Sequence, residues 1–143
     1  MASGCGGVPP VVFEGMHLDT NMLIGASEVG SPIRRQVEEW LRAGEPLQAS
    51  AMAWAEYLCG PLAPGEEAAC FSLLDQICPK DAATATLGSK LYNFTGRRSR
   101  SLADCLIAAT AILAGQPLAS ANLSDFQPVT AYGLTLFSPG NFP

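Results

Sequence analysis

The stretch SLADCLIAATAILAGQPLASANLSDF, residues 101–126, contains the features that decide the fold. Residues 102–114 are almost entirely apolar, which predicts a helix that is buried on all sides. Gly115 and Gln116 then form a turn, and residues 117–120 predict a short central strand followed by a loop at 121–126. A buried helix that leads directly into a buried strand is typical of a parallel sheet covered by helices.

The same alternation of strands and helices extends along the rest of the chain. We predict an α/β fold with three layers, α/β/α, around a mostly parallel sheet. A flexible leader, rich in Gly and Pro, is expected at residues 1–15, and one domain at 16–143. Strands are predicted at 11–18, 47–50, 117–120 and 134–137, and helices after Asp19 and at 32–43, 51–62, 65–77, 81–94 and 102–114.

The composition excludes several classes of protein. Only 15% of the 143 residues are charged and 48% are hydrophobic, so the chain is not intrinsically disordered. No apolar run reaches the roughly 18 residues of a transmembrane helix, and the first residues lack the basic side chains of a secretory signal. The five cysteines form no CxxC pair and His17 is the single histidine, so we expect a reduced, cytoplasmic protein without a zinc site.

The charge balance bears on the partners of the chain. Eight basic and thirteen acidic residues give a net charge of −5, which argues against a protein that binds nucleic acid through its own charge. Metal ions would have to supply positive charge for such a partner. The positive mean hydropathy, +0.21, indicates apolar surface that another chain covers.

Four acidic residues occupy unusual places in the sequence. Asp19 directly follows a predicted strand, Glu56 lies among apolar residues of a predicted helix, and Asp104 is the only charge in residues 102–114. Asp125 and the nearby Asn122 follow the central strand. Because ligands of open α/β sheets bind beyond the carboxyl ends of the strands, we expect these side chains to gather there.

Each of these residues also has a purely structural interpretation. Asp19 is a plausible helix N-cap, Ser101 and Asp104 fit a capping box, and Asn122 or Asp125 can close an Asx-turn. The apolar neighbours of Glu56 suggest burial. Taken together, however, several clustered carboxylates repel one another unless a cation shares their site, and oxygen ligands favour Mg²⁺ or Mn²⁺.

As an ordered set these motifs resemble those of PIN-domain ribonucleases, and in particular of VapC toxins from type II toxin–antitoxin pairs. The resemblance extends over about residues 16–138, and its fourth motif begins with Asn122, where many relatives have Asp, so that either Asn122 or Asp125 fills the fourth acidic position. It rests on Leu18-Asp19-Thr20-Asn21, Ala55-Glu56, Leu102-Ala103-Asp104 and the segment Ser120-Ala121-Asn122-Leu123-Ser124-Asp125-Phe126.

The resemblance implies a PIN-like α/β/α fold and Mg²⁺-dependent cleavage of single-stranded RNA. In these terms Asp19 and Asp104 are the direct metal ligands, while Glu56 and Asp125 bind a second metal or orient the attacking water. Thr20, Asn21 and Asn122 would support the carboxylates by hydrogen bonds. The implied partners are the RNA substrate, a cognate antitoxin and a second copy of the chain.

Two further interpretations concern the surroundings of this site. Arg97, Arg98 and Arg100 precede Asp104 and form either a clamp for RNA phosphates or a solvated loop. The alternative functions are a PIN-like binding module that has lost catalysis, and another acid-dependent phosphate hydrolase. A dehalogenase-like phosphatase is disfavoured, because such enzymes need a second Asp where this chain has Asn21.

Overall fold

A computed structural model of the chain describes residues 15–96 and 101–137. Their strands form one five-stranded sheet in the order β3-β2-β1-β4-β5, and every neighbouring pair is parallel. The elements in chain order are β1 (Met16–Leu18), α1 (Thr20–Gly25), α2 (Pro32–Arg42), β2 (Leu47–Ser50), α3 (Ala51–Cys59), α4 (Glu66–Leu73), β3 (Gln76–Cys78), α5 (Ala82–Phe94), α6 (Leu102–Ala114), β4 (Leu118–Ala119), α7 (Leu123–Phe126), a 3₁₀ helix (Gln127–Tyr132) and β5 (Leu136–Phe137).

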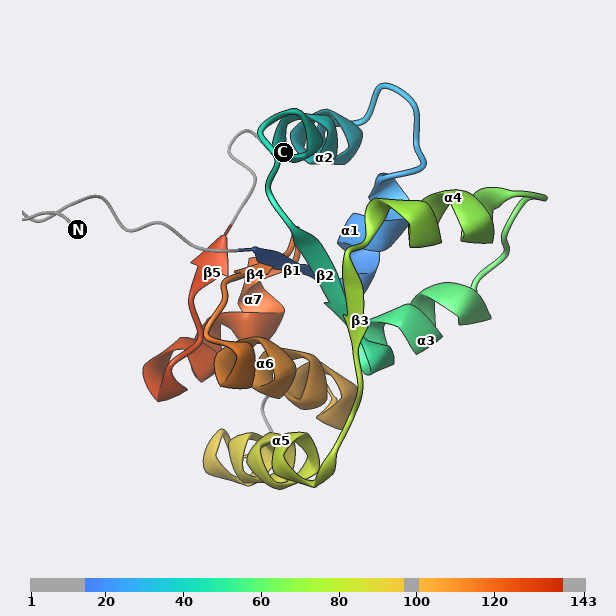
Figure 1. The fold of residues 1–143 in the computed structure, drawn as a ribbon. Helices are drawn as coiled ribbons and strands as arrows, with labels where there is room; N and C mark the ends of the chain where they lie inside the picture. Colours follow the sequence, from blue (N-terminus) through green and yellow to red (C-terminus); the bar gives the residue numbers. More distant parts are fainter. Residues whose placement is uncertain (1–14, 97–100, 138–143) are drawn as a thin grey trace, which may run out of the picture.

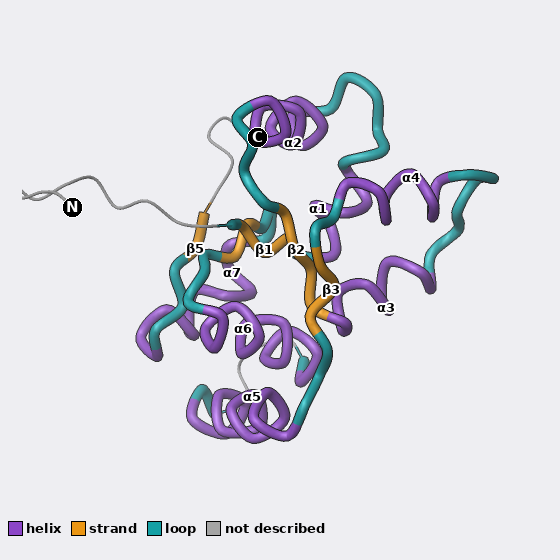
Figure 2. The backbone as a smooth tube through the Cα atoms, viewed as in Figure 1, coloured by secondary structure: helices purple, strands orange, loops and turns teal. Residues whose placement is uncertain are grey.

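The sheet is covered on both faces, which confirms the predicted α/β/α layers. Helices α1, α2 and α4 lie on one side of the sheet and α6 and α7 on the other, with α5 packed outside α6 (Figure 1). The short strands run through the middle of this arrangement (Figure 2). None of the helices in the described ranges is long and apolar enough to cross a membrane.

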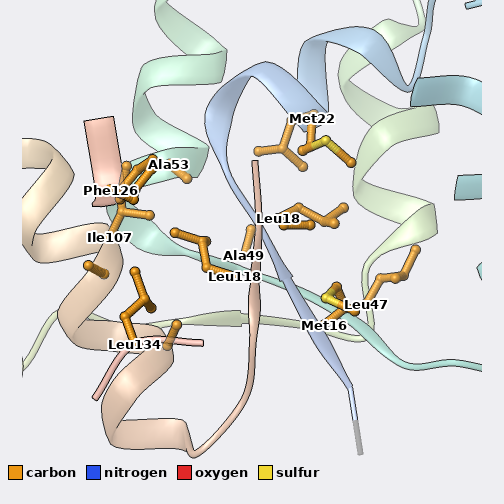
Figure 3. Packing of buried hydrophobic residues seen from close by; sticks show 14 of the residues in the cluster. Met16, Leu18, Met22, Leu47, Ala49, Ala53, Ile107, Leu118, Phe126 and Leu134 are labelled. Carbon is orange, nitrogen blue, oxygen red and sulfur yellow. The ribbon is translucent and has the colours of Figure 1, made fainter. Parts of the chain in front are cut away.

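The hydrophobic core explains why the central segments lie where they do. Met16, Leu18 and Met22 pack on one face of the sheet, while Ile107 and Phe126 pack on the other (Figure 3). Helix α6 is buried continuously from Cys105 to Ala111, as expected for a helix that is apolar on all sides. This burial fixes the position of the helix start, and therefore of the charged residue in its first turn.

A close approach joins α5 to α6. Gly88 lies so near Leu106 that a Cβ atom added to the glycine would be 2.6 Å from Leu106 Cδ2 and 3.3 Å from its Cα. Only glycine allows the two helices to come this close at the described backbone positions.

Two sequence predictions are wrong. The helix expected at 65–77 ends at Leu73, and Gln76–Cys78 instead forms the edge strand β3. Asp75 stabilises this strand, because its N–H donates to the Leu47 carbonyl at 2.7 Å and its carboxylate accepts from the Leu47 N–H at 2.8 Å. The loop expected at 121–126 contains the short helix α7.

Other predicted boundaries differ by a few residues. The helix expected at 51–62 ends at Cys59, before Pro61, and the strand expected at 117–120 is Leu118–Ala119. Strand β1 begins at Met16, so the strand expected at 11–18 does not include Gly15; residues 11–14 lie outside the described residues, as does the leader up to residue 14.

Candidate active site

Asp19 stands at the carboxyl end of β1, in the centre of the sheet. Its N–H continues the strand pairing by donating to the Ala119 carbonyl at 3.0 Å. The side chain is only 5% exposed and caps α1, because its Oδ1 accepts from the Thr20 N–H at 2.7 Å. The N-cap interpretation of Asp19 is therefore correct, and it leaves the second carboxylate oxygen for another role.

Ser120 supplies the partner of that second oxygen. Its hydroxyl donates to Asp19 Oδ2 at 2.8 Å, and it accepts from the Asn122 N–H at 2.9 Å. Ser120 is fully buried and follows β4, the strand beside β1. The sequence interpretation included Ser120 in the fourth motif but gave it no role; its position after the central strand places it beside Asp19 once the register of β1 and β4 is known.

Glu56 approaches the same region from α3. Its Oε1 accepts from the Thr20 hydroxyl at 2.7 Å, which ties α3 to the first turn of α1. The expected burial of Glu56 is wrong, since the residue is exposed. The apolar neighbours Trp54 and Tyr57 lie on other sides of the helix and contact each other, with ring centroids 5.2 Å apart.

Asp104 lies half-buried in the first turn of α6. Its N–H donates to the Ser101 hydroxyl at 3.1 Å, so the helix cap predicted from the sequence is present. Burial, and after it the negative charges of Asp19, Asp125 and Glu56, raise the pKa of Asp104 to about 6, although a hydrogen bond with Ser101 acts in the opposite direction. The cap and the carboxylate cluster therefore coexist at this residue.

The four predicted acids influence one another electrostatically. Burial raises the pKa of Asp19, against hydrogen bonds from Ser120 and Thr20, and the charges of Glu56 and Asp125 raise it further. Asp125 is half-buried in α7 and acts on both Asp19 and Asp104. Asn122 is exposed and makes no side-chain cap bond, so Asp125 is the acid that α7 brings to this cluster.

Two expected contributors are not seen in the site. No hydrogen bond joins Asn21 to a carboxylate in the described residues, and within them its buried Oδ1 has no partner. Arg97, Arg98 and Arg100 lie outside the ranges that the structure describes.

The carboxylates of this cluster suit an ion such as Mg²⁺, which needs few protein ligands, better than an ion that several side chains must enclose. Within residues 15–96 and 101–137, no three His, Cys, Asp or Glu side chains lie close enough to hold one ion among them. Mg²⁺, however, is usually held by one or two carboxylates, with water and substrate phosphate completing its shell. Asp19 and Asp104 meet that requirement, since like charges favour a shared cation.

We expect the repulsion at Asp104 to appear in the pH dependence of stability. Because the raised pKa makes the folded protein hold this proton more tightly than the unfolded chain, stability from Asp104 is present below pH 4 and is lost as the pH rises through about 6. Burial lowers the pKa of His17, which acts in the opposite direction over part of this range. The Asp104→Asn variant isolates the carboxyl.

In metal-free buffer, the free energy of unfolding of Asp104→Asn relative to the parent should therefore increase from pH 4 to pH 7. Urea titrations of both proteins at several pH values measure this difference. A difference that is constant with pH would contradict the electrostatic cluster.

Comparisons with known proteins agree with this architecture. The family model of the PIN domain matches residues 16–129 of the sequence. No curated protein matches the chain. Solved structures share the fold of this chain. In the three that are described next, the matching region includes nearly all of the solved chain.

The first is VapBC2 from Rickettsia felis bound to a promoter DNA fragment, with 19% identity over 87% of this chain and 98% of that chain and a TM-score of 0.69. A toxin–antitoxin complex from Klebsiella pneumoniae is 22% identical over 89% of this chain and 99% of that chain, with a TM-score of 0.69. FitAcB from Neisseria gonorrhoeae is 24% identical over the same shares, 89% and 99%, with a TM-score of 0.65. At these identities the likeness establishes the fold.

Proposed function

Because this chain belongs to the PIN-domain family, we propose that it is a metal-dependent endoribonuclease that cleaves single-stranded RNA and acts as the toxin of a toxin–antitoxin pair. The observation that carries the proposal is the cluster of Asp19, Glu56, Asp104 and Asp125 at the carboxyl ends of β1 and β4. Catalysis is favoured over a silent binding module, because Asp19 and Asp104 are kept together although their proximity disfavours ionisation.

The residues have distinct roles in this proposal. Asp19 and Asp104 would hold Mg²⁺, or alternatively Mn²⁺, and the ion would supply charge stabilisation for the phosphodiester transition state. Asp125 and Glu56 lie near this pair and are suited to orient the attacking water. Thr20 holds Glu56 in place through the 2.7 Å hydrogen bond of its hydroxyl.

The partner of the toxin is expected in a groove between α1, α2 and α4. The groove has a volume of about 530 Å³, and its walls include Leu23, Val37, Leu41 and Leu73. We infer that an apolar face of an antitoxin helix packs here, as amphipathic helices do in hydrophobic grooves, and that a basic residue of the antitoxin reaches the acidic cluster. Several structures with this fold were solved as toxin–antitoxin complexes, which supports the inference.

We also propose a cytoplasmic homodimer with one PIN-like domain at residues 16–143 and a leader at 1–15. Exposed apolar side chains such as Leu58 on α3 and Phe71 on α4 provide surface for a second copy. The three arginines at 97, 98 and 100 remain predicted phosphate contacts.

Removal of the metal tests the proposed function directly. The purified chain should cleave a single-stranded RNA in Mg²⁺, lose this activity in excess EDTA, and regain it when Mg²⁺ or Mn²⁺ is restored. Gel analysis of a mixed-sequence RNA measures cleavage, and a hairpin of the same composition serves as the control for single-strand preference. Activity that persists in EDTA would contradict the metal-dependent mechanism, and a chain inactive with every metal would favour the binding module.

A further inference from the structure

The acidic cluster poses an electrostatic problem for its proposed substrate. RNA is a polyanion, and the charged side chains that act on Asp104 are the carboxylates of Asp19, Asp125 and Glu56. The site itself is therefore negatively charged. A metal ion can neutralise the phosphate that is cleaved, but the flanking phosphates need other cations. The inference below rests on the proposed function, because it concerns the path of the RNA toward that site.

Five basic residues lie in the described ranges, and four of them are placed away from the carboxyl edge or already engaged. Arg34 forms an ion pair with Glu38 at 3.2 Å, and Arg35 donates to the Gly30 carbonyl at 3.1 Å. Arg42 is in the last turn of α2, which precedes the amino end of β2. Lys90 lies nine residues beyond the cap of α5, roughly 13 Å along the helix.

Lys80 occupies a different position, which follows from the register of the strands. β2 and β3 pair Ser50 with Cys78, and β1 and β2 pair His17 with Gln48, so Asp19, Ser50 and Cys78 lie in one row across three adjacent strands. Lys80 is two residues beyond this row, on the edge of the sheet where the acidic cluster lies. Two strand spacings, about 10 Å, separate the row positions of Asp19 and Cys78.

The local sequence keeps the Lys80 ammonium available. Pro79 favours an extended backbone at Cys78, so the chain continues outward from the strand. The neighbouring Asp81 is occupied as the cap of α5, since its Oδ1 accepts from the Thr84 N–H and hydroxyl, each at 2.9 Å. Lys80 is exposed and takes part in no ion pair with the described residues.

We propose that Lys80 binds a backbone phosphate of the single-stranded RNA a few nucleotides away from the cleaved bond. The separation of about 10 Å between the row positions of Asp19 and Cys78 corresponds to roughly three stacked nucleotides, at about 3.4 Å each, or fewer in an extended strand. The contact is to phosphate and carries no base specificity, so it positions the RNA along the β1-β2-β3 side of the sheet.

Salt-dependent binding tests the proposal with a charge-matched control. Lys80→Gln and Lys90→Gln remove the same charge from exposed sites. Binding of a fluorescent single-stranded RNA to each full-length protein is followed by anisotropy in EDTA, from 50 to 200 mM KCl. Losing one phosphate contact should flatten the slope of log affinity against log salt by about 0.7, so that the affinity ratio of parent to Lys80→Gln shrinks about 2.6-fold over this range. Lys90→Gln should keep the parental slope.

Kinetics in Mg²⁺ separate this inference from the proposed function. Lys80→Gln should raise KM and leave kcat unchanged, because the contact is remote from the reacting phosphate. Equal slopes for the two variants would overturn the Lys80 contact even if the parent cleaves RNA. A changed oligomeric state of Lys80→Gln with a parental slope would also overturn it, in favour of a contact between protein chains. If the parent binds RNA through Lys80 but never cleaves it, only the proposed catalysis fails.

Discussion

Replacing Asp104 with asparagine is expected to abolish RNA cleavage and to leave the metal-free protein at least as stable as the parent. The substitution preserves shape but removes one of the two carboxylates proposed to hold the metal. Loss of several kcal/mol of transition-state stabilisation corresponds to about a thousandfold or more in rate. Stability should not fall, because the charges of Asp19, Asp125 and Glu56 disfavour ionised Asp104 in the fold.

Magnesium distinguishes this explanation from a role in helix capping. Mg²⁺ should raise the melting temperature of the parent and have much less effect on Asp104→Asn, since a ligand of the native state stabilises it by mass action. Ser101→Ala is the matched control, because it removes the hydroxyl that accepts from the Asp104 N–H. That variant should lose about 1 kcal/mol with or without metal. An active, destabilised and metal-indifferent Asp104→Asn would refute the proposed nuclease site.

Ser120→Ala should give the second large effect. The variant removes the hydroxyl that donates to Asp19 at 2.8 Å in a fully buried position. A hydrogen bond to a charged group contributes about 1.5–3 kcal/mol, so the free energy of unfolding near pH 7 should fall by about that amount. Mg²⁺ affinity should fall too, because Asp19 loses the group that orients it.

Exposed serines provide the control for this substitution. Ser72 and Ser89 donate to carbonyls of their own helices, at 2.7 and 3.0 Å, and their replacement by Ala should change stability by less than about 0.5 kcal/mol. The cost of Ser120→Ala should also shrink at acidic pH, where a protonated Asp19 depends less on the donor. Ser120→Thr, which keeps a hydroxyl, should retain part of the Mg²⁺ response. Chemical denaturation and thermal shifts in Mg²⁺ measure these differences.

The central part of the fold could be predicted from the sequence because local signals there agree with burial. Helix α6 is apolar on all sides, begins at the Ser101 cap and ends at Gly115, and β4 follows at once. Strand β3 was not predictable in the same way. It has three residues, lies at the sheet edge and includes the exposed Gln76, so it lacks a strand pattern. Its pairing depends on β2, which is distant in sequence.

In the candidate site, too, some residues could be predicted from local sequence and others could not. Asp19 and Asp104 could be singled out because each is a charge at the edge of an apolar segment. Ser120 could not, because a serine after a strand is common and only the register of β1 and β4 places it against Asp19. Glu56 was misjudged because apolar neighbours in sequence do not show which side of a helix is covered.

The hydrogen bond between Ser120 and Asp19 spans 101 positions of the chain. A ribosome adds about 5–20 residues each second, so roughly 5–20 s pass between the synthesis of the two residues. During that interval β1 lacks its neighbour β4, and the Asp19 carboxylate lacks its hydroxyl donor. A nascent chain therefore cannot assemble the site before β4 has been translated, so each copy can begin the proposed activity only late in its own synthesis.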